Sequence, residues 1–377
     1  MKFSDLATIR KSTVHPQAFD GYDNYLGFEH FDPGTLRFET TGDPASVSST
    51  KQEFLPGDTI YGKLRPYFRK VGWSKDLRGI CSTDLWVFKP KPGVDPRFVF
   101  YVAGSQEFTD LATQSSEGTR MPRASWSVVK DFEVLDFTLG EQRAIASTLG
   151  ALDDKIESNR RAVVTISNLI DASSEKNSID LPTVPLGEIA TTIKESVNPS
   201  KLGGATVDHF SLPAFDSGAR PERVAASTIM SNKLEVPKSA ILLSRLNPRF
   251  NRTWWASAGT ETSALASTEF LVLTSEDALE LAAVWLAVRD SFFREELPKR
   301  VTGTSGSHQR VRPDDVLTIE VPDFRSASLK VKQSTLGLLM RAESLRIESD
   351  RLTALRDALL PELLCGRMRV PVGGVAS

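Results

Sequence analysis

The clearest hydrophobic pattern lies near the middle of the chain, where seven apolar residues and one asparagine recur at alternating steps of four and three. These positions are Ile145, Leu149, Leu152, Ile156, Asn159, Val163, Ile166 and Ile170. Such heptad spacing predicts a long helix whose apolar stripe needs a partner helix. Thr138 followed by Glu141 has the spacing of a capping box, which indicates that the helix begins there. Continued to about Ser174, it would be about 50 Å long, more than a compact domain requires.

A second, less regular stripe is found between about Ser328 and Leu364. Its apolar members are Leu338, Leu345, Leu352, Leu355 and Leu359, interrupted by Arg341 and Glu348. Because the chain supplies two helices that each expose a stripe, the simplest prediction is that they pair with one another. Packing of each helix on its own domain alone is the alternative. Asn159 could fix the register of the pair, or could simply be solvated.

The long helices follow two copies of one sequence. Lys63-Leu-Arg-Pro-Tyr-Phe-Arg-Lys-Val-Gly-Trp73 aligns without a gap with Arg245-Leu-Asn-Pro-Arg-Phe-Asn-Arg-Thr-Trp-Trp255. Cys81-Ser-Thr-Asp-Leu-Trp-Val-Phe88 aligns likewise with the segment from Ala266 to Leu273. A repeat of roughly 185 residues indicates a duplicated domain, because solenoid repeats run about 20 to 50 residues.

Each copy mixes short strand-like runs with helical ones. Thr59-Ile-Tyr61, Leu85-Trp-Val-Phe88 and Phe270-Leu-Val-Leu273 are predicted strands, since aromatic and β-branched residues lie between Gly, Pro and Asp. Residues 96–108 and 278–293 are predicted helices, with apolar positions near a period of 3.6. The predicted fold class is therefore α+β: two similar α/β domains joined by two long antiparallel coiled-coil helices.

Composition narrows the class of protein. With 377 residues, 40% apolar and 25% charged, the chain can bury sizeable cores. A net charge of -2 means that local patches would have to meet any anionic partner. Cys81 and Cys365 are too few for a disulfide framework or a zinc site. The amino terminus lacks the pattern of a signal peptide, and the longest apolar stretch is too short to span a membrane, so we expect a cytoplasmic protein.

Common catalytic signatures are missing. The chain has no phosphate-binding Gly-x4-Gly-Lys-Ser/Thr loop, no His-Glu-x-x-His and no Gly-x-Ser-x-Gly. Asn247-Pro-Arg-Phe250 departs from the Asn-Pro-Pro-Tyr/Phe loop of amino-methyltransferases, and the first copy lacks the Asn as well. Pro313-Asp-Asp315 with Glu320 lacks the Lys of a nuclease cluster. We therefore assign no catalytic residue and no metal ligand.

Basic and aromatic residues gather at matching places in both copies. Arg and Lys neutralise phosphates, while Arg, Asn and Gln can make bidentate contacts with base edges. Each segment alone is more often a solvated face, but recurrence in both copies favours a paired DNA-binding surface. The candidate DNA-binding residues are Lys63, Arg65, Arg69, Lys70, Arg120, Arg123, Arg245, Asn247, Arg249, Asn251, Arg252, Ser307, His308, Gln309 and Arg310.

At the first long helix the chain resembles a known family. The segment from Glu141 to Ile156 is similar to the Glu-Gln-x-x-Ile-Ala-x-x-Leu-x-x-Leu-Asp-x-x-Ile signature of the specificity subunits of type I restriction-modification systems. The segment from Leu359 to Gly366 resembles their carboxyl end. The second copy departs from the signature, with Ser328-Leu-Lys330 in place of Glu-Gln.

The resemblance implies two target recognition domains, each followed by a long helix. The expected boundaries are 1–139 for the first domain, 140–180 for its helix, 181–325 for the second domain and 326–377 for the second helix and tail. The residues expected at the subunit or helix interface are Glu141, Gln142, Ile145, Leu149, Leu152, Ile156, Val163, Leu352, Leu355 and Leu359.

The resemblance also implies partners and a division of labour. Each domain would read one half of a bipartite double-stranded DNA target, and the helix pair would set the gap between the halves. The helices would dock two methyltransferase subunits, which use S-adenosylmethionine, and through them restriction and translocase subunits that use ATP and Mg. The chain itself would be non-catalytic, with no cofactor of its own and no membrane contact.

Two other interpretations stay open. The chain could be a non-enzymatic coiled-coil scaffold whose basic loops are only soluble surface, or an orphan DNA-binding defence factor with another effector. In the DNA-binding interpretation, aligned residues that differ, such as Arg65 and Asn247, are expected to read bases. Aligned residues that are both basic, Lys70 and Arg252, are expected to touch phosphate.

Overall fold

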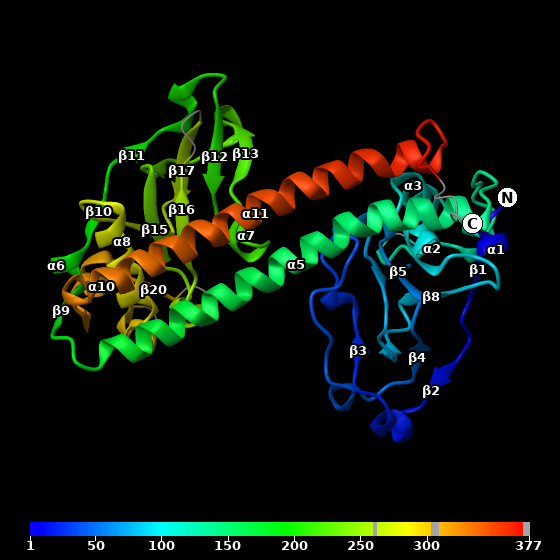
Figure 1. The fold of residues 1–377 in the computed structure, drawn as a ribbon, viewed down its shortest axis with the longest axis horizontal. Coiled ribbons are helices and arrows are strands. Elements are labelled where there is room, and N and C mark those ends of the chain that lie inside the picture. The colour runs from blue at the N-terminus through cyan, green and yellow to red at the C-terminus, as the bar shows by residue number, and fades with distance from the viewer. Residues whose placement is uncertain (119, 259–261, 303–308, 372–377) are drawn as a thin grey trace, which may run out of the picture. The chain divides into compact units, whose positions relative to one another are not determined.

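The computed structural model describes residues 1–118, 120–258, 262–302 and 309–371. The chain forms two compact units, the first made of Met1–Ser158 with Glu348–Ser377 and the second of Asn159–Ile347. Helices α5 (Leu139–Ser178) and α11 (Leu329–Leu364) each run without a break (Figure 1). The first unit thus contains the beginning of α5 and the end of α11, and the second unit contains the rest of both helices. The mixed α+β class predicted from the sequence is confirmed.

The first unit has two four-stranded sheets. One is antiparallel, in the order β1-β8-β5-β6, with bounds Ala7–Ile9, Leu85–Pro90, Thr59–Gly62 and Val71–Trp73. The other has the order β2-β4-β7-β3, with bounds Thr13–Val14, Lys51–Phe54, Gly79–Cys81 and Tyr25–Leu26. In this second sheet β3 runs parallel to β7.

The second unit repeats both sheets in the same strand order. The first is β10-β18-β15-β16, with bounds Thr191–Ile193, Phe270–Thr274, Ser239–Ser244 and Thr253–Ser257. The second is β11-β14-β17-β12-β13, with bounds Ser196–Val197, Lys233–Glu235, Ser263–Ser267, Thr206–Phe210 and Glu222–Ala225. Its parallel pair, β12 with β17, matches β3 with β7, and β13 is an added edge strand. The order of the strands, which the sequence alone did not define, therefore follows the repeat.

The helices predicted at residues 96–108 and 278–293 are each interrupted. In the first unit the predicted helix consists of α2 (Pro96–Ala103) and α3 (Gln106–Gln114), and in the second of α8 (Ala278–Arg289) and α9 (Ser291–Glu296). The prediction of single helices over 96–108 and 278–293 was wrong. The hydroxyl of Ser105 and the carboxylate of Asp290 accept hydrogen bonds from the first turns of α3 and α9, so each caps a new helix.

The start of α5 agrees with the predicted capping box. The Thr138 amide donates to the Glu141 carboxylate at 2.9 Å, and the Glu141 amide donates to the Thr138 hydroxyl at 3.3 Å. This reciprocal pair satisfies two first-turn amides that have no partner within the helix.

In the first unit, α5 and α11 complete one apolar core. Ile145 and Leu149 on α5 and Leu360 and Leu363 on α11 are buried in the same cluster as the aromatic residues of β5, β8 and α2. Leu355, expected on the stripe of α11, is instead 47% exposed. Arg356 and Leu360, which are buried positions of α11 in this unit, lie one residue beyond Leu355 and Leu359 of the predicted stripe.

In the second unit, the other lengths of the same helices pack together. Ile166 and Ile170 of α5 share a buried cluster with Leu339, Ala342 and Leu345 of α11. Asn159 is buried, and its side-chain amide donates to the Leu345 carbonyl at 3.5 Å. This contact places the one polar seam residue of α5 against the backbone of α11, as a register-setting role would require.

The two units fill the space beneath their helices differently. Leu36 lies two residues after the glycine of one Phe-Asp-x-Gly segment, and Ala219 lies one residue after the glycine of the other; their φ angles are 56° and 54°. Leu36 is buried in the core of the first unit. Ala219 lines a cavity of about 200 Å³ in the second unit, together with Phe215, Trp254, Trp255, Trp285 and Arg289 among others.

We expect Ala219→Leu to stabilise the second unit. Ala219 lines the cavity, and Leu36 shows that leucine adopts a left-handed φ of similar size in the first unit, so we expect cavity filling to add about 0.5 to 2 kcal/mol. Differential scanning calorimetry of the full chain would show a raised melting temperature. The control is Ala151→Leu, which adds the same side chain at an exposed position of α5. A lowered melting temperature specific to Ala219→Leu would show that the cavity does not accept a leucine side chain from this position.

Candidate nucleic-acid interface

The predicted basic segments form the same loop in both units. We call residues 63–70 the first basic loop and residues 245–252 the second. Each contains a short 3-10 turn, η4 (Pro66–Phe68) or η7 (Pro248–Phe250), that begins with proline. The residues flanking η4 are Arg65 and Arg69, with φ angles of 48° and 46°. Those flanking η7 are Asn247 and Asn251, with φ angles of 48° and 45°.

Because the backbone conformation is shared, the Arg-to-Asn differences between the two loops can be compared by the conformational cost of each residue. The left-handed region is costly for most residues, but Asn enters it several-fold more often than other non-glycine residues. Asn247 and Asn251 therefore suit the turn by conformation alone. Arg65 and Arg69 occupy the same turn at a conformational cost, so their side chains must be retained for another reason.

A second loop is hydrogen-bonded to each basic loop. In the first unit the Arg65 amide donates to the Pro122 carbonyl at 2.7 Å, and the Ala124 amide donates to the Lys63 carbonyl at 2.9 Å. In the second unit the Asn247 amide donates to the Gln309 carbonyl at 2.8 Å, and the Val311 amide donates to the Arg245 carbonyl at 3.1 Å. We call the second segments, residues 120–124 and 309–311, the clasp loops. The structure thus brings together the two basic segments that the sequence predicted separately.

A corresponding ion pair holds each clasp. Arg123 lies 3.0 Å from Asp84, and Arg310 lies 2.7 Å from Glu269 in a two-pronged contact. Asp84 and Glu269 are aligned in the repeat, as are the two arginines relative to their clasp loops. The pairing with Glu269 raises the pKa of Arg310. These two predicted DNA-binding arginines are therefore engaged with carboxylates of their own unit.

Lys70 and Arg252, predicted to touch phosphate, also have partners within the chain. The Lys70 ammonium donates to the Phe28 carbonyl at 2.8 Å and lies 4.2 Å from the centre of the Phe28 ring. Burial lowers its pKa. Arg252 makes a two-pronged contact with Asp216, at 2.7 and 2.9 Å. Both side chains tie the basic loop to the Phe-Asp-x-Gly region, and their contact with phosphate stays a prediction.

Three further candidates lie at the base of the loops. Burial lowers the pKa of Lys63 and that of Arg69. The Arg69 guanidinium reaches Gln106 at 3.3 Å and Asp357 at 3.7 Å. Arg245 donates to the Val311 and Thr268 carbonyls at 3.3 and 3.4 Å. These residues support the loops more than they project from them.

The exposed tips of the loops combine cations with large apolar side chains. In the first unit Arg65 and Arg120 are exposed, beside Tyr67 at 52% and Met121 at 48% exposure. In the second unit Arg249 is exposed next to Phe250, which is 54% exposed, with the guanidinium 4.8 Å from the ring centre. The search for charges missed Tyr67, Met121 and Phe250. The signal available was an aromatic residue within an otherwise polar turn.

The remaining candidates have less to show. Asn247 is half-buried, and its side-chain oxygen has no hydrogen-bond partner among the described residues. Gln309 and Asn251 are half-buried as well. Ser307 and His308 lie outside the described residues.

The residues predicted at a helix interface are placed in several environments. Glu141 pairs with Arg369 at 2.6 Å. Gln142 is buried, bonded to the Asp95 amide and the Phe137 carbonyl, and is therefore internal to the first unit. Leu152, Ile156, Val163, Leu352 and Leu359 are half-buried. Of these five residues, Val163 packs against the core of the second unit and Leu359 against that of the first.

Within residues 1–118, 120–258, 262–302 and 309–371, no three His, Cys, Asp or Glu side chains come together as metal ligands would. Over the same residues, no helix combines the length and apolar character needed to cross a membrane.

The sheets, helices and loops define a class of protein: two similar mixed domains, each with a length of two long helices and a clasped basic loop. No family model matches the chain. The chain is 32% identical over 127 residues to the type I restriction enzyme EcoDI specificity subunit of Escherichia coli, a match covering 33% of this chain and 28% of that protein. The matched region thus spans just over a quarter of the length of that curated relative.

Solved structures extend the likeness to nearly the whole chain. The type I restriction-modification S subunit from M. genitalium aligns over 97% of this chain and 95% of its own, with a TM-score of 0.57 and 16% identity. The HsdS subunit from Thermoanaerobacter tengcongensis aligns over 98% and 96%, with a TM-score of 0.40 and 18% identity. The resemblance to type I specificity subunits drawn from the sequence is confirmed, and the M. genitalium structure shows that the fold is shared.

We expect loss of a clasp ion pair to loosen its loops without unfolding the unit. Arg310→Gln removes a partly exposed ion pair, worth at most about 1 kcal/mol to global stability. Hydrogen exchange at the Asn247 and Val311 amides should nevertheless become faster, because these amides bridge the two loops. Arg223→Gln, which removes the two-pronged contact with Asp208 elsewhere in the unit, is the control. Equal exchange at both amides in the two variants would count against the clasp.

Proposed function

We propose that this chain is the DNA-binding specificity subunit of a type I restriction-modification complex. One observation carries the proposal: a clasped basic loop with the same backbone geometry occurs in both units, with cations and large apolar side chains at its tip. In this proposal each unit reads one half of a bipartite double-stranded target. The chain has no catalytic group of its own, and methyltransferase and restriction subunits supply the S-adenosylmethionine, ATP and Mg chemistry.

Charge arguments support contact at the loop tips. The chain has a net charge of -2, so attraction to DNA must be local. Arg123, Arg252 and Arg310 are paired with carboxylates of their own unit, whereas Arg65, Arg120 and Arg249 are exposed at the tips of the described loops. A small number of phosphate contacts predicts a modest dependence of affinity on salt, and binding by the complex rather than by the chain alone.

The exposed apolar side chains at the loop tips support contact with bases in a groove of the DNA. Tyr67, Met121 and Phe250 would be poorly placed on a purely soluble surface, whereas apolar side chains can contact the thymine methyl group or wedge at a base step. The proposed partners of the long helices are two methyltransferase subunits, with the restriction subunits bound through them. Exposed apolar residues on both helices support such docking, among them Val164, Leu169, Met340 and Leu355.

A salt titration tests the proposal. Binding of the full chain to a library of duplex DNA is measured between about 50 and 200 mM salt, with and without the methyltransferase subunit. We expect sequence-selective binding that strengthens when the methyltransferase is added. Absence of DNA binding under both conditions, with intact assembly, would favour the scaffold interpretation instead.

Arg65→Asn isolates a side-chain contact from the fold. Asn is the residue at the matching left-handed position of the second unit, so the turn should form as well or better. If the guanidinium reads a base edge, the change costs about 1 to 3 kcal/mol of binding free energy and relaxes one position of one half-site. Selection from a random duplex library measures both effects.

The matched control is Lys75→Asn, which removes an exposed cation from another left-handed position, with a φ of 51°. It should leave sequence preference unchanged. Loss of preference in both half-sites on Arg65→Asn would contradict separate reading by the two units.

A further inference from the structure

Arg356, on α11 in the first unit, is a charged residue in the interior. It is 3% exposed, although arginine is almost never fully buried without partners. Its guanidinium donates to Asp153 at 2.8 Å and to Asp357 at 2.8 and 3.0 Å. It also reaches the Thr35 carbonyl at 3.5 Å. Burial alone would lower its pKa, but the two carboxylates hold the pKa above its ordinary value.

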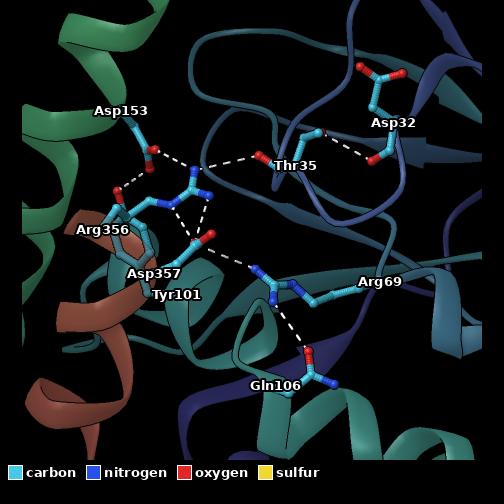
Figure 2. A network of polar contacts seen from close by, with 8 residues as sticks. All are labelled: Asp32, Thr35, Arg69, Tyr101, Gln106, Asp153, Arg356 and Asp357. Atoms are coloured by element: carbon cyan, nitrogen blue, oxygen red, sulfur yellow. Dashed lines mark hydrogen bonds and ion pairs between the residues drawn. The ribbon is translucent and has the colours of Figure 1, made fainter. Parts of the chain in front are cut away.

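The network continues from Arg356 to the first basic loop (Figure 2). Asp357 lies between Arg356 and Arg69, with the Arg69 guanidinium 3.7 Å away. Arg69 also reaches Gln106 of α3 at 3.3 Å. On the other side, the Tyr101 hydroxyl donates to Asp153 at 2.6 Å. Two arginines and two aspartates thus form a balanced cluster that joins α5, α11 and α2 to the loop.

A second path leads to the same loop through the backbone. Thr35, which accepts from Arg356, belongs to the Phe-Asp-x-Gly segment, and the Gly34 amide there donates to the Phe68 carbonyl at 3.1 Å. Arg356 therefore contacts both the carboxylate that holds Arg69 and the segment that holds Phe68. The side chain of Arg69 is only 16% exposed, which leaves little of it for DNA.

The second unit has no equal arrangement among its described residues. The position of Arg69 is taken by Asn251, whose short side chain forms no hydrogen bond there that the structure records. The conformational cost of arginine at this left-handed position is therefore offset in the first unit by an ionic contact that asparagine does not need.

We propose that Asp357 is a positioning residue for the first basic loop: it holds Arg69 against the first unit, so that Arg69 orients the loop and does not contact DNA. This inference rests on the proposed function, since orientation of the loop matters only if the loop reads DNA. Arg69, a candidate DNA-binding residue in the sequence, thereby becomes a residue that orients the loop. Through Asp357, α11 contributes to the sequence specificity of the first unit.

The direction in which Asp357→Asn changes DNA affinity distinguishes a positioning role from a phosphate contact. If Arg69 contacted phosphate, removing the nearby negative charge in Asp357→Asn would strengthen DNA binding or leave it unchanged. If Asp357 positions the loop, the same change weakens selective binding and blurs one half-site. Arg69→Gln should then also leave the salt dependence unchanged, because no phosphate contact is lost.

The test uses the full chain in two measurements. Hydrogen exchange of the free protein should become about tenfold faster in residues 66–70 for Asp357→Asn and for Arg69→Gln, and no faster when both are combined. Selection from a random duplex library, with the methyltransferase present, should then show loss of preference in one half-site only. Glu362→Gln is the control, since it makes the same charge change on α11 at an exposed pair with Arg367.

Each outcome has a defined meaning. Unchanged exchange at residues 66–70 in Asp357→Asn, or tighter DNA binding by that variant, overturns the positioning role. Faster exchange in the variants, combined with no DNA binding by the wild-type chain in the presence of the methyltransferase, supports the contact and overturns the proposed function instead.

Discussion

Each core in this chain depends on apolar surface supplied by both long helices. The sheets of the first unit are covered partly by Leu360 and Leu363, near the end of the chain, and those of the second by Ile166 and Ile170. A long amphipathic helix gains most of its stability from such packing rather than from its own propensity. Each core therefore contains buried residues of both α5 and α11.

The sequence predicted the elements that have a clear period or a clear cap. The heptads of α5, its capping box and the duplication all follow from local spacing, and the strands β5, β8 and β18 follow from composition. The breaks at Ser105 and Asp290 were missed because the apolar pattern continues across them, and only the capping bonds reveal the new start. Leu355 was misplaced because a leucine repeat defines a stripe less well than the packing partner does.

The candidate site was harder to predict than the fold, because charge in sequence says nothing about pairing in space. Arg123, Arg310 and Arg252 are basic residues in the right loops, yet each faces a carboxylate whose position in sequence is 36 to 41 residues away. Exposed apolar residues such as Tyr67 and Phe250 became visible only when the turn placed them outside. The ion pairs stabilise loop shape, and the exposed tips are what remains for recognition.

The two basic loops share their backbone conformation but differ in their side chains. The backbone is held by hydrogen bonds between main-chain groups, at Arg65 and Pro122 in one unit and at Asn247 and Gln309 in the other. Main-chain bonds place no demand on side-chain identity, so a tip residue can change while the turn keeps its shape. The left-handed positions limit that freedom, because only some residues adopt them without cost. At Arg69 the first unit adds an ionic contact with Asp357 of α11, and the helix thereby becomes part of the loop's support.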